Sequence, residues 1–83
     1  MDKLLIGNFG GIKIKSVADL GSVVRQTRKG QTLTQVDIAG LAQTGNRFLV
    51  DLENGKETIQ LGKVLTVLEL LGLELVVCKK ASE

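Results

Sequence analysis

The sequence contains no histidine, no tryptophan, no tyrosine and a single cysteine, Cys78. Histidine is the most frequent general acid or base in enzymes, and zinc is held mainly by cysteine and histidine. This composition therefore excludes histidine-based catalysis and a cluster of cysteine and histidine ligands. We expect no catalytic residues, no metal site and no cofactor, and we expect that the protein is not an enzyme.

The other absences concern location and the core. Cys78 alone cannot form an intramolecular disulfide, and the sequence has neither a signal peptide nor an apolar run of membrane-spanning length. These features favour the reducing cytoplasm and predict no membrane partner. Hydrophobic residues make up 43% of the chain but aromatic residues only 2%. The core must therefore consist of leucine, valine and isoleucine.

The chain of 83 residues is long enough for one domain with a small core. Its net charge of +2 is too small to indicate nucleic-acid binding, but the charges are unevenly distributed. Residues 1–36 hold six basic and two acidic residues, whereas residues 37–83 hold five basic and seven acidic ones. One face could thus meet phosphate and another a protein, although an ordinary solvated surface is the alternative interpretation.

Two capping patterns mark the starts of the first two predicted helices. Ser16 and Asp19, and likewise Thr34 and Asp37, have the spacing in which a side-chain oxygen accepts an unpaired amide of the first helical turn. The first helix is expected to end at Gly30. Before it, residues 1–15 form an N-terminal arm in which residues 4–6 and 12–14 are candidates for short strands.

The segment from Thr34 to Lys56 carries the clearest functional signal. It contains a second helix that begins after Thr34 and a third that runs from about residue 45 or 46 to Asn54, where Gly55 ends it. Two short helices joined by a tight turn are the layout of a helix-turn-helix, whose second helix lies in the DNA major groove.

The last predicted helix begins at a cap on Thr58 and ends at Gly72. It is apolar on two sides, which a chain of this size can hardly cover by itself, so a second subunit is the natural cover. Residues 73–78 have the composition of a strand and need a partner, which is residues 12–14, the same strand of a second protomer, or both. The residues expected at the dimer interface are Val67, Leu70, Leu73, Leu75 and Val77.

Several of these residues together resemble the Xre/Cro-type helix-turn-helix, and most closely the HipB-like antitoxins. The resemblance covers roughly residues 12–78 and includes Leu33 to Gln35, Ile38 and Ala39, Leu49, and the run from Leu52 to Lys56. It implies a mainly α, four- to five-helix lambda-repressor-like domain over residues 16–72. A dimerisation strand at residues 73–78, which pairs across a homodimer, and a tail at residues 79–83 follow.

The resemblance also implies a function. It predicts a transcriptional autorepressor, associated with the nucleoid in the cytoplasm, that binds an inverted repeat of double-stranded DNA. It further predicts the antitoxin of a type II toxin–antitoxin system, with a HipA-like serine/threonine kinase toxin as protein partner and no small-molecule substrate.

Individual roles follow from the positions that match the family. Asn46 suits the N6 and N7 atoms of adenine, Arg47 suits the O6 and N7 atoms of guanine, and Asp51 is expected to hold Arg47 in place. Arg28 and Glu53 are expected to form a structural ion pair. The residues predicted to read bases are Gly45, Asn46, Arg47 and Val50, and those predicted to contact the DNA backbone are Thr34, Gln35, Asn54 and Lys56.

The sequence also departs from the family pattern. Gln43 stands in the turn where the family usually has glycine, so a positive φ would be unfavourable there and the turn is expected to differ slightly. Gly45 replaces the usual serine or threonine cap. Val36 and Leu41 are apolar where the family is polar; they are either scattered surface residues or contacts for the kinase. Phe48 either packs against the second helix or touches a thymine methyl, and packing is the preferred interpretation.

Two other functions remain open. The first is a stand-alone regulator, such as a phage repressor or a restriction controller, without a toxin. The second is a protein-interaction module that caps a partner and no longer binds DNA, which the modest net charge and Asp51 leave open.

Overall fold

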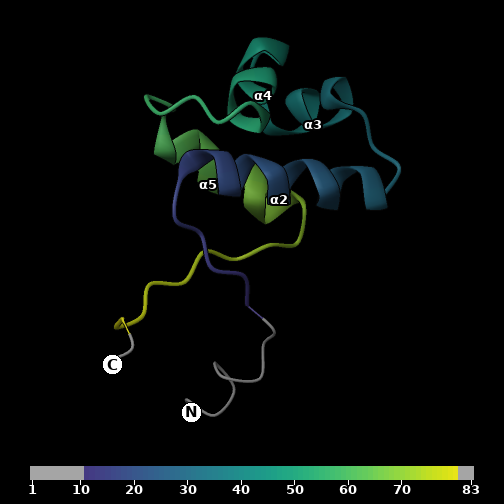
Figure 1. The fold of residues 1–83 in the computed structure, drawn as a ribbon. Coiled ribbons are helices and arrows are strands. Elements are labelled where there is room, and N and C mark those ends of the chain that lie inside the picture. Colours follow the sequence, from purple (N-terminus) through teal and green to yellow (C-terminus); the bar gives the residue numbers. More distant parts are fainter. Residues whose placement is uncertain (1–10, 81–83) are drawn as a thin grey trace.

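The computed structural model describes residues 11–80, and within them the chain forms four helices. These are α2 (Val17–Gly30), α3 (Gln35–Ala42), α4 (Asn46–Glu53) and α5 (Leu61–Leu70). Helix α4 packs against both α2 and α3, and α3 also packs against α5. In Figure 1, α3 and α4 lie at one end of the molecule, and the segments before α2 and after α5 extend from the other. The predicted mainly helical fold is confirmed.

The described chain contains no β-strand. Residues 12–14 and 73–78 have no regular secondary structure, so the alternative in which these two segments pair within one chain is wrong. Instead, both segments line an open groove with Leu20 and Val23 of α2 and with Leu68 of α5. The other predicted strand, at residues 4–6, lies outside the described residues.

Side-chain caps begin two of the helices. Thr34 and Asp37 form the predicted reciprocal box, in which the Asp37 amide donates to Thr34 Oγ1 at 3.0 Å and the Thr34 amide donates to Asp37 Oδ2 at 2.9 Å. The Asp19 amide likewise donates to Ser16 Oγ at 3.1 Å. However, the Asp19 carboxylate accepts from the Lys15 amide rather than from the Ser16 amide, so this box is shifted by one residue.

All four described helices end in the same backbone motif. A left-handed residue follows each helix, and the amide after it donates to the carbonyl five residues earlier, which pairs a carbonyl that the helix leaves free. The left-handed residues are Thr32, Gln43, Gly55 and Gly72, with φ between 56° and 80°. The chain therefore turns away from α2 at Thr32, two residues beyond the glycine predicted to end that helix.

Helix α5 begins two residues later than predicted. Its N-cap is Gln60, without a side-chain hydrogen bond, and Thr58 lies in a turn closed by the Ile59 amide and the Lys56 carbonyl at 3.2 Å. Residues 57–60 therefore belong to the loop, from which Ile59 packs against the core. A capping pattern cannot predict this, because it carries no information on tertiary contacts.

Aliphatic side chains from every described helix build the core, as the composition predicts. Six of them are completely buried: Val24, Ile38, Leu49, Leu52, Val64 and Val67. The prediction that Val67 lies at the dimer interface is wrong. Val67 is 0% exposed within a single chain and therefore cannot contact a second one.

Two close backbone approaches set the packing of α4 on α2. A Cβ atom built on Gly21 of α2 would lie 2.2 Å from the Leu52 carbonyl oxygen. A Cβ atom on Gly55 would lie 2.8 Å from Ala18 Cα. The absence of side chains at these two positions thus lets α2 and the end of α4 meet directly.

No helix of the described residues is long and apolar enough to span a bilayer.

Candidate nucleic-acid interface

Helices α3 and α4 form the predicted helix-turn-helix. They are connected through residues 43–45, where Gln43 adopts a φ of 58° and the Thr44 amide donates to the Ala39 carbonyl at 2.9 Å. Gln43 thus adopts a left-handed conformation, although this conformation is unfavourable for a residue with a Cβ atom. Gly45 is the N-cap of α4 and, as expected, supplies no side-chain cap.

The predicted base-reading residues lie at the start and on the outer face of α4. Gly45, Asn46 and Arg47 are exposed, and Val50 is half-buried. The side chain of Arg47 is 83% exposed. The structure thus brings these four residues together on one accessible end of the helix.

A carboxylate lies between two of the cationic candidates. Asp51 Oδ1 is 3.1 Å from Arg47 Nε, and Asp51 Oδ2 is 3.5 Å from Lys56 Nζ. The Arg47 contact has the predicted spacing of four residues along the helix. The Lys56 contact was not anticipated, because it depends on the turn that follows α4.

The predicted backbone-contacting residues surround the opposite end of α4. Thr34 caps α3, Gln35 opens it, Asn54 caps the end of α4, and Lys56 follows Gly55. Helix α4 has eight residues, so this group lies on the order of 10 Å along the axis from Asn46. The Gln35 side chain is already engaged, since its Nε2 donates to Glu53 Oε1 at 3.0 Å.

Arg28 and Glu53 form the ion pair that the family resemblance predicts. Arg28 Nε donates to Glu53 Oε2 at 2.6 Å, and Nη2 donates to Oε1 at 3.0 Å. The third contact, from Nη1 to the Leu33 carbonyl at 2.8 Å, ties the same guanidinium to the connection before α3. The two side chains are only 9% and 3% exposed, so Arg28 is placed for a structural role and not for phosphate.

The contacts within and around this ion pair shift the pKa values of both Arg28 and Glu53. The hydrogen bond to Glu53 raises the pKa of Arg28 above its ordinary value. Burial raises the pKa of Glu53, but the hydrogen bonds from Arg28 and Gln35 and the charges of Arg28 and Arg25 outweigh burial. The net pKa of Glu53 is therefore lowered, and the carboxylate is ionised at neutral pH.

Phe48 packs inward. It is half-buried against the hydrophobic core, and Lys63 Nζ of α5 lies 5.8 Å from the centre of its ring, within the range of a cation–π contact. The Lys63 contact joins α4 to α5 and could not be read from the sequence, because the two residues are far apart along the chain.

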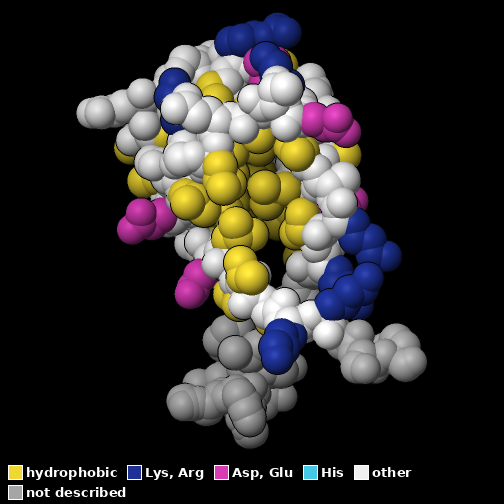
Figure 2. All heavy atoms as spheres, turned by 90° about the vertical axis from the view of Figure 1, so that its left-hand side faces the viewer, with side chains coloured by type: hydrophobic (Ala, Val, Ile, Leu, Met, Phe, Trp, Pro, Cys, Tyr) yellow, Lys and Arg dark blue, Asp and Glu magenta, His cyan; other side chains and the backbone are white. Residues whose placement is uncertain are grey.

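The remaining candidates for a dimer interface differ in exposure. Leu73 is half-buried against the core of its own chain, whereas Leu70, Leu75 and Val77 are exposed, with Val77 at 95%. The exposed apolar side chains also include Leu61 and Leu65 of α5. Figure 2 shows apolar side chains gathered into a patch on one face of the molecule, with basic side chains beside it.

Among the described residues, no group of three or more cysteine or acidic side chains is placed to hold a metal ion.

Comparison with known proteins places this geometry in a family. No protein-family model matches the sequence. The chain is 57% identical over 60 residues to the uncharacterized HTH-type transcriptional regulator y4mF of Sinorhizobium fredii, an alignment that spans 72% of this chain and 79% of that protein.

Solved structures of HipB have the same fold. A HipB–O4 20mer complex is similar with a TM-score of 0.78 at 21% identity, and covers 86% of this chain and 100% of that one. A HipA–HipB–O2–O3 complex is similar with a TM-score of 0.79 at 21% identity, over the same shares of the two chains. The chain thus belongs to the HTH-type transcriptional regulators, which are DNA-binding proteins and not enzymes, and it has the fold of HipB.

Proposed function

We propose that the protein is a homodimeric repressor that reads an inverted-repeat operator with α4 and also serves as the antitoxin of a HipA-like kinase. The observation that carries the DNA-reading part is the exposed start of α4. Asn46 and Arg47 lie there on a helix that Arg28 and Glu53 fix to α2. In this arrangement Arg47 pairs with guanine and Asn46 with adenine, each contributing about 1–3 kcal/mol of discrimination if bidentate.

Backbone contacts set the register on the duplex. Thr34 and Gln35 stand at the N-terminus of α3, where free amides and the helix dipole favour a phosphate. Asn54 and Lys56 follow the end of α4 and reach the neighbouring phosphates in this proposal. Gln35 therefore has two roles, since its side-chain amide also supports Glu53.

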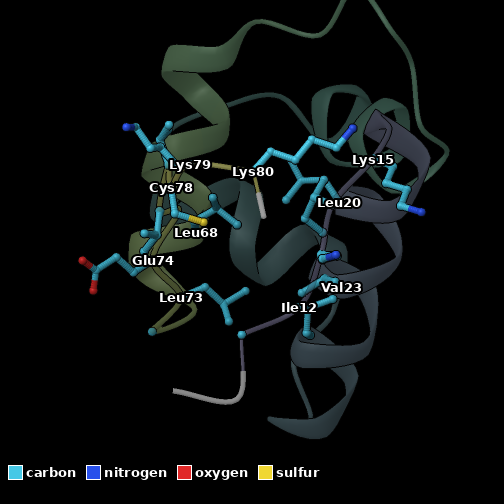
Figure 3. A pocket seen from close by; sticks show the side chains of 16 residues that line it. Ile12, Lys15, Leu20, Val23, Leu68, Leu73, Glu74, Cys78, Lys79 and Lys80 are labelled. Carbon is cyan, nitrogen blue, oxygen red and sulfur yellow. The ribbon is translucent and has the colours of Figure 1, made fainter. Parts of the chain in front are cut away.

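The apolar surface at the other end of the molecule supports the proposed dimer. Leu70, Leu75 and Val77 are exposed, and the segment after α5 lines a groove of about 1280 Å³. Figure 3 shows Leu20, Val23 and Ile12 facing this groove from one side and Leu68 and Leu73 from the other. A second copy that pairs its residues 73–78 with this segment would cover the apolar side chains and supply the missing strand partner.

The antitoxin role is supported by the resemblance to HipB-like antitoxins and by the fold shared with HipB, which is known in a complex with HipA. A surface for such a partner is available on α3. Val36 and Leu41 are 66% and 63% exposed, at positions that are polar in the family. A kinase that covers them would explain why apolar residues are retained there.

DNA binding is tested by selection from a pool of duplexes with a randomised centre, followed by anisotropy titrations of the selected duplex over a range of salt concentrations. We expect an inverted-repeat consensus and an affinity that falls linearly with salt on a logarithmic scale. Arg47→Ala should relax preference at one base pair per half-site. Gln35→Ala should weaken binding to all sequences alike, provided that its unfolding curve shows a folded domain.

Arg25→Ala is the control for base preference, because it removes an exposed positive charge from α2, a helix that holds none of the residues proposed to read bases. It should leave base preference unchanged. Our placement of the interface is wrong if Arg47→Ala changes neither affinity nor base preference.

A pull-down from the native host that identifies both bound DNA and bound protein tests the proposed kinase partner. Recovery of operator DNA without a kinase would favour a stand-alone regulator instead.

A further inference from the structure

Asp51 is an acidic residue within a surface proposed to meet phosphates. Its side chain is 17% exposed and lies between Arg47 and Lys56, at 3.1 Å and 3.5 Å from their nitrogens. A lone carboxylate in this position would repel DNA, but here two cations accompany it. The three side chains together carry one positive charge, which is compatible with binding to a polyanion.

Two separate features of the backbone create this arrangement. The α-helix places Arg47 one turn before Asp51. The left-handed Gly55, with a φ of 80°, then reverses the chain so that the Lys56 amide donates to the Asp51 carbonyl at 3.0 Å. This bond brings the Lys56 side chain back over the end of α4. The carboxylate thus joins a residue that reads bases in the proposed function to one that contacts phosphate.

The atom through which Arg47 is held matters for readout. The ion pair involves Nε, the guanidinium nitrogen nearest the backbone. The two terminal nitrogens keep their donors, and a pair of such donors is what guanine O6 and N7 accept. An arginine that is 83% exposed and otherwise free would populate many rotamers.

We propose that Asp51 is a positioning residue for base recognition, which holds Arg47 and Lys56 in the geometry that reads guanine and lowers the affinity for DNA of any other sequence. This inference rests on the proposed function, since it requires that Arg47 contacts a base. Asp51 itself touches no base in this arrangement.

Asp51→Asn is the informative variant, because it keeps the size of the side chain and removes its charge. We expect the preference for guanine at the Arg47 position to fall by about three- to tenfold, the range expected for an ion pair that supports one bidentate contact. At the same time, the affinity for a duplex without the consensus should rise, because one negative charge is lost. A merely structural role would lower both affinities together and also lower the melting temperature.

Glu57→Gln is the matched control. Glu57 is exposed, lies close to Asp51 in sequence, and has no ion pair among the described residues. Glu57→Gln removes one negative charge, as Asp51→Asn does. It should leave the guanine preference unchanged. In the Arg47→Ala background, Asp51→Asn should cause no further loss of preference, because the residue that it positions is gone.

The readout is the base preference of each variant in the selection from the randomised duplex pool, together with anisotropy titrations on the selected duplex and a scrambled one. The inference is overturned if Asp51→Asn keeps the wild-type guanine preference, or if it loses as much preference in the Arg47→Ala background as in the wild type. If the wild-type protein itself selects no consensus, it is the proposed function that fails, and the two results cannot be confused.

Discussion

The carboxylate of Glu53 connects three helices through individual hydrogen bonds. It accepts two from Arg28 of α2 and one from Gln35 of α3, while Glu53 itself belongs to α4. With both members of the ion pair almost completely buried, removal of one leaves a buried charge without its partner. The recognition helix is thereby fixed to the rest of the domain at its C-terminal end, which leaves its N-terminal end free to meet DNA.

The lowered pKa of Glu53 makes stability depend on pH. The unfolded chain binds a proton near the ordinary value of 4.5, and the folded chain binds it only at lower pH. The stabilisation is therefore present above about pH 4.5 and is lost as the pH falls through the folded pKa. We expect Glu53→Gln to lower the free energy of unfolding at neutral pH by about 2–4 kcal/mol, and to make its decline at acid pH shallower.

Urea unfolding at a series of pH values measures this effect. The difference between wild type and Glu53→Gln should shrink as the pH falls below about 4.5. Some acid dependence should persist in the variant, because hydrogen bonds with Thr34 also lower the pKa of Asp37. Glu57→Gln serves as the control and should behave as wild type. A difference that stays constant down to strongly acid pH would show that the ion pair is not the cause.

Gln43 is a second residue whose effect is local. Its φ of 58° places a side chain in the left-handed region, which costs an L-residue about 1–2 kcal/mol relative to right-handed helix. Gln43→Gly should raise the free energy of unfolding by about 0.5–1 kcal/mol, less than the full strain because glycine loses more backbone entropy. Thermal unfolding would detect this as a rise in Tm. Gln43→Ala keeps the Cβ atom and should give no such gain; equal effects of the two substitutions would exclude backbone strain.

At the scale of elements, the approach of α2 to α4 depends on glycine. The Leu52 carbonyl oxygen occupies the space where a Cβ atom on Gly21 would lie. Gly21→Ala should therefore lower the free energy of unfolding by about 2–3 kcal/mol, although alanine favours a helix by about 1 kcal/mol over glycine. The atom in the way belongs to the backbone of α4, so the helices must separate to accommodate the methyl group.

Gly40→Ala is the comparison for this prediction. Gly40 lies within α3, and nothing is within 4 Å of the position of its Cβ atom. We expect this substitution to raise the free energy of unfolding by up to about 1 kcal/mol in the same denaturation experiment. If the two substitutions shift stability in the same direction, the close approach at Gly21 does not govern the packing of α2 on α4.

At the scale of the whole molecule, Leu75 and Val77 are apolar side chains that a single chain leaves exposed, and the proposed dimer covers them. The proposed dimer predicts that the wild-type protein sediments as a dimer at micromolar concentration. Val77→Asp should give a folded monomer, because a charge at a side chain that is 95% exposed in one chain affects only association. Its affinity for an inverted repeat should fall by at least about 100-fold, since the two half-sites are then bound separately.

Val36→Asp is a suitable control for the sedimentation experiment. Val36 is also an exposed valine, at 66%, but it lies on α3. Circular dichroism should show that both variants keep their helices. A wild-type protein that remains monomeric at micromolar concentration would contradict the dimer, as would a Val77→Asp variant that sediments like the wild type.

Much of the helical region could be predicted because its signals are local. The capping box of Thr34 and Asp37, the stop at Gly55 and the spacing of Arg47 and Asp51 all depend on residues within one or two turns of each other. The base-reading roles do not follow from such local signals. They rest on the positions that match the family and stay predictions, and Gly45, Asn46 and Arg47 are exposed as these roles require.

What only the tertiary structure decided involves residues that are distant in sequence. It showed that Val67 belongs to the core of its own chain and that residues 73–78 form no strand with residues 12–14. It also paired Gln35 with Glu53 and placed Lys63 over Phe48. An apolar pattern predicts that a side chain will be buried, but it does not identify the surface that covers that side chain. The periodicity is the same whether the covering surface comes from the same chain or from another.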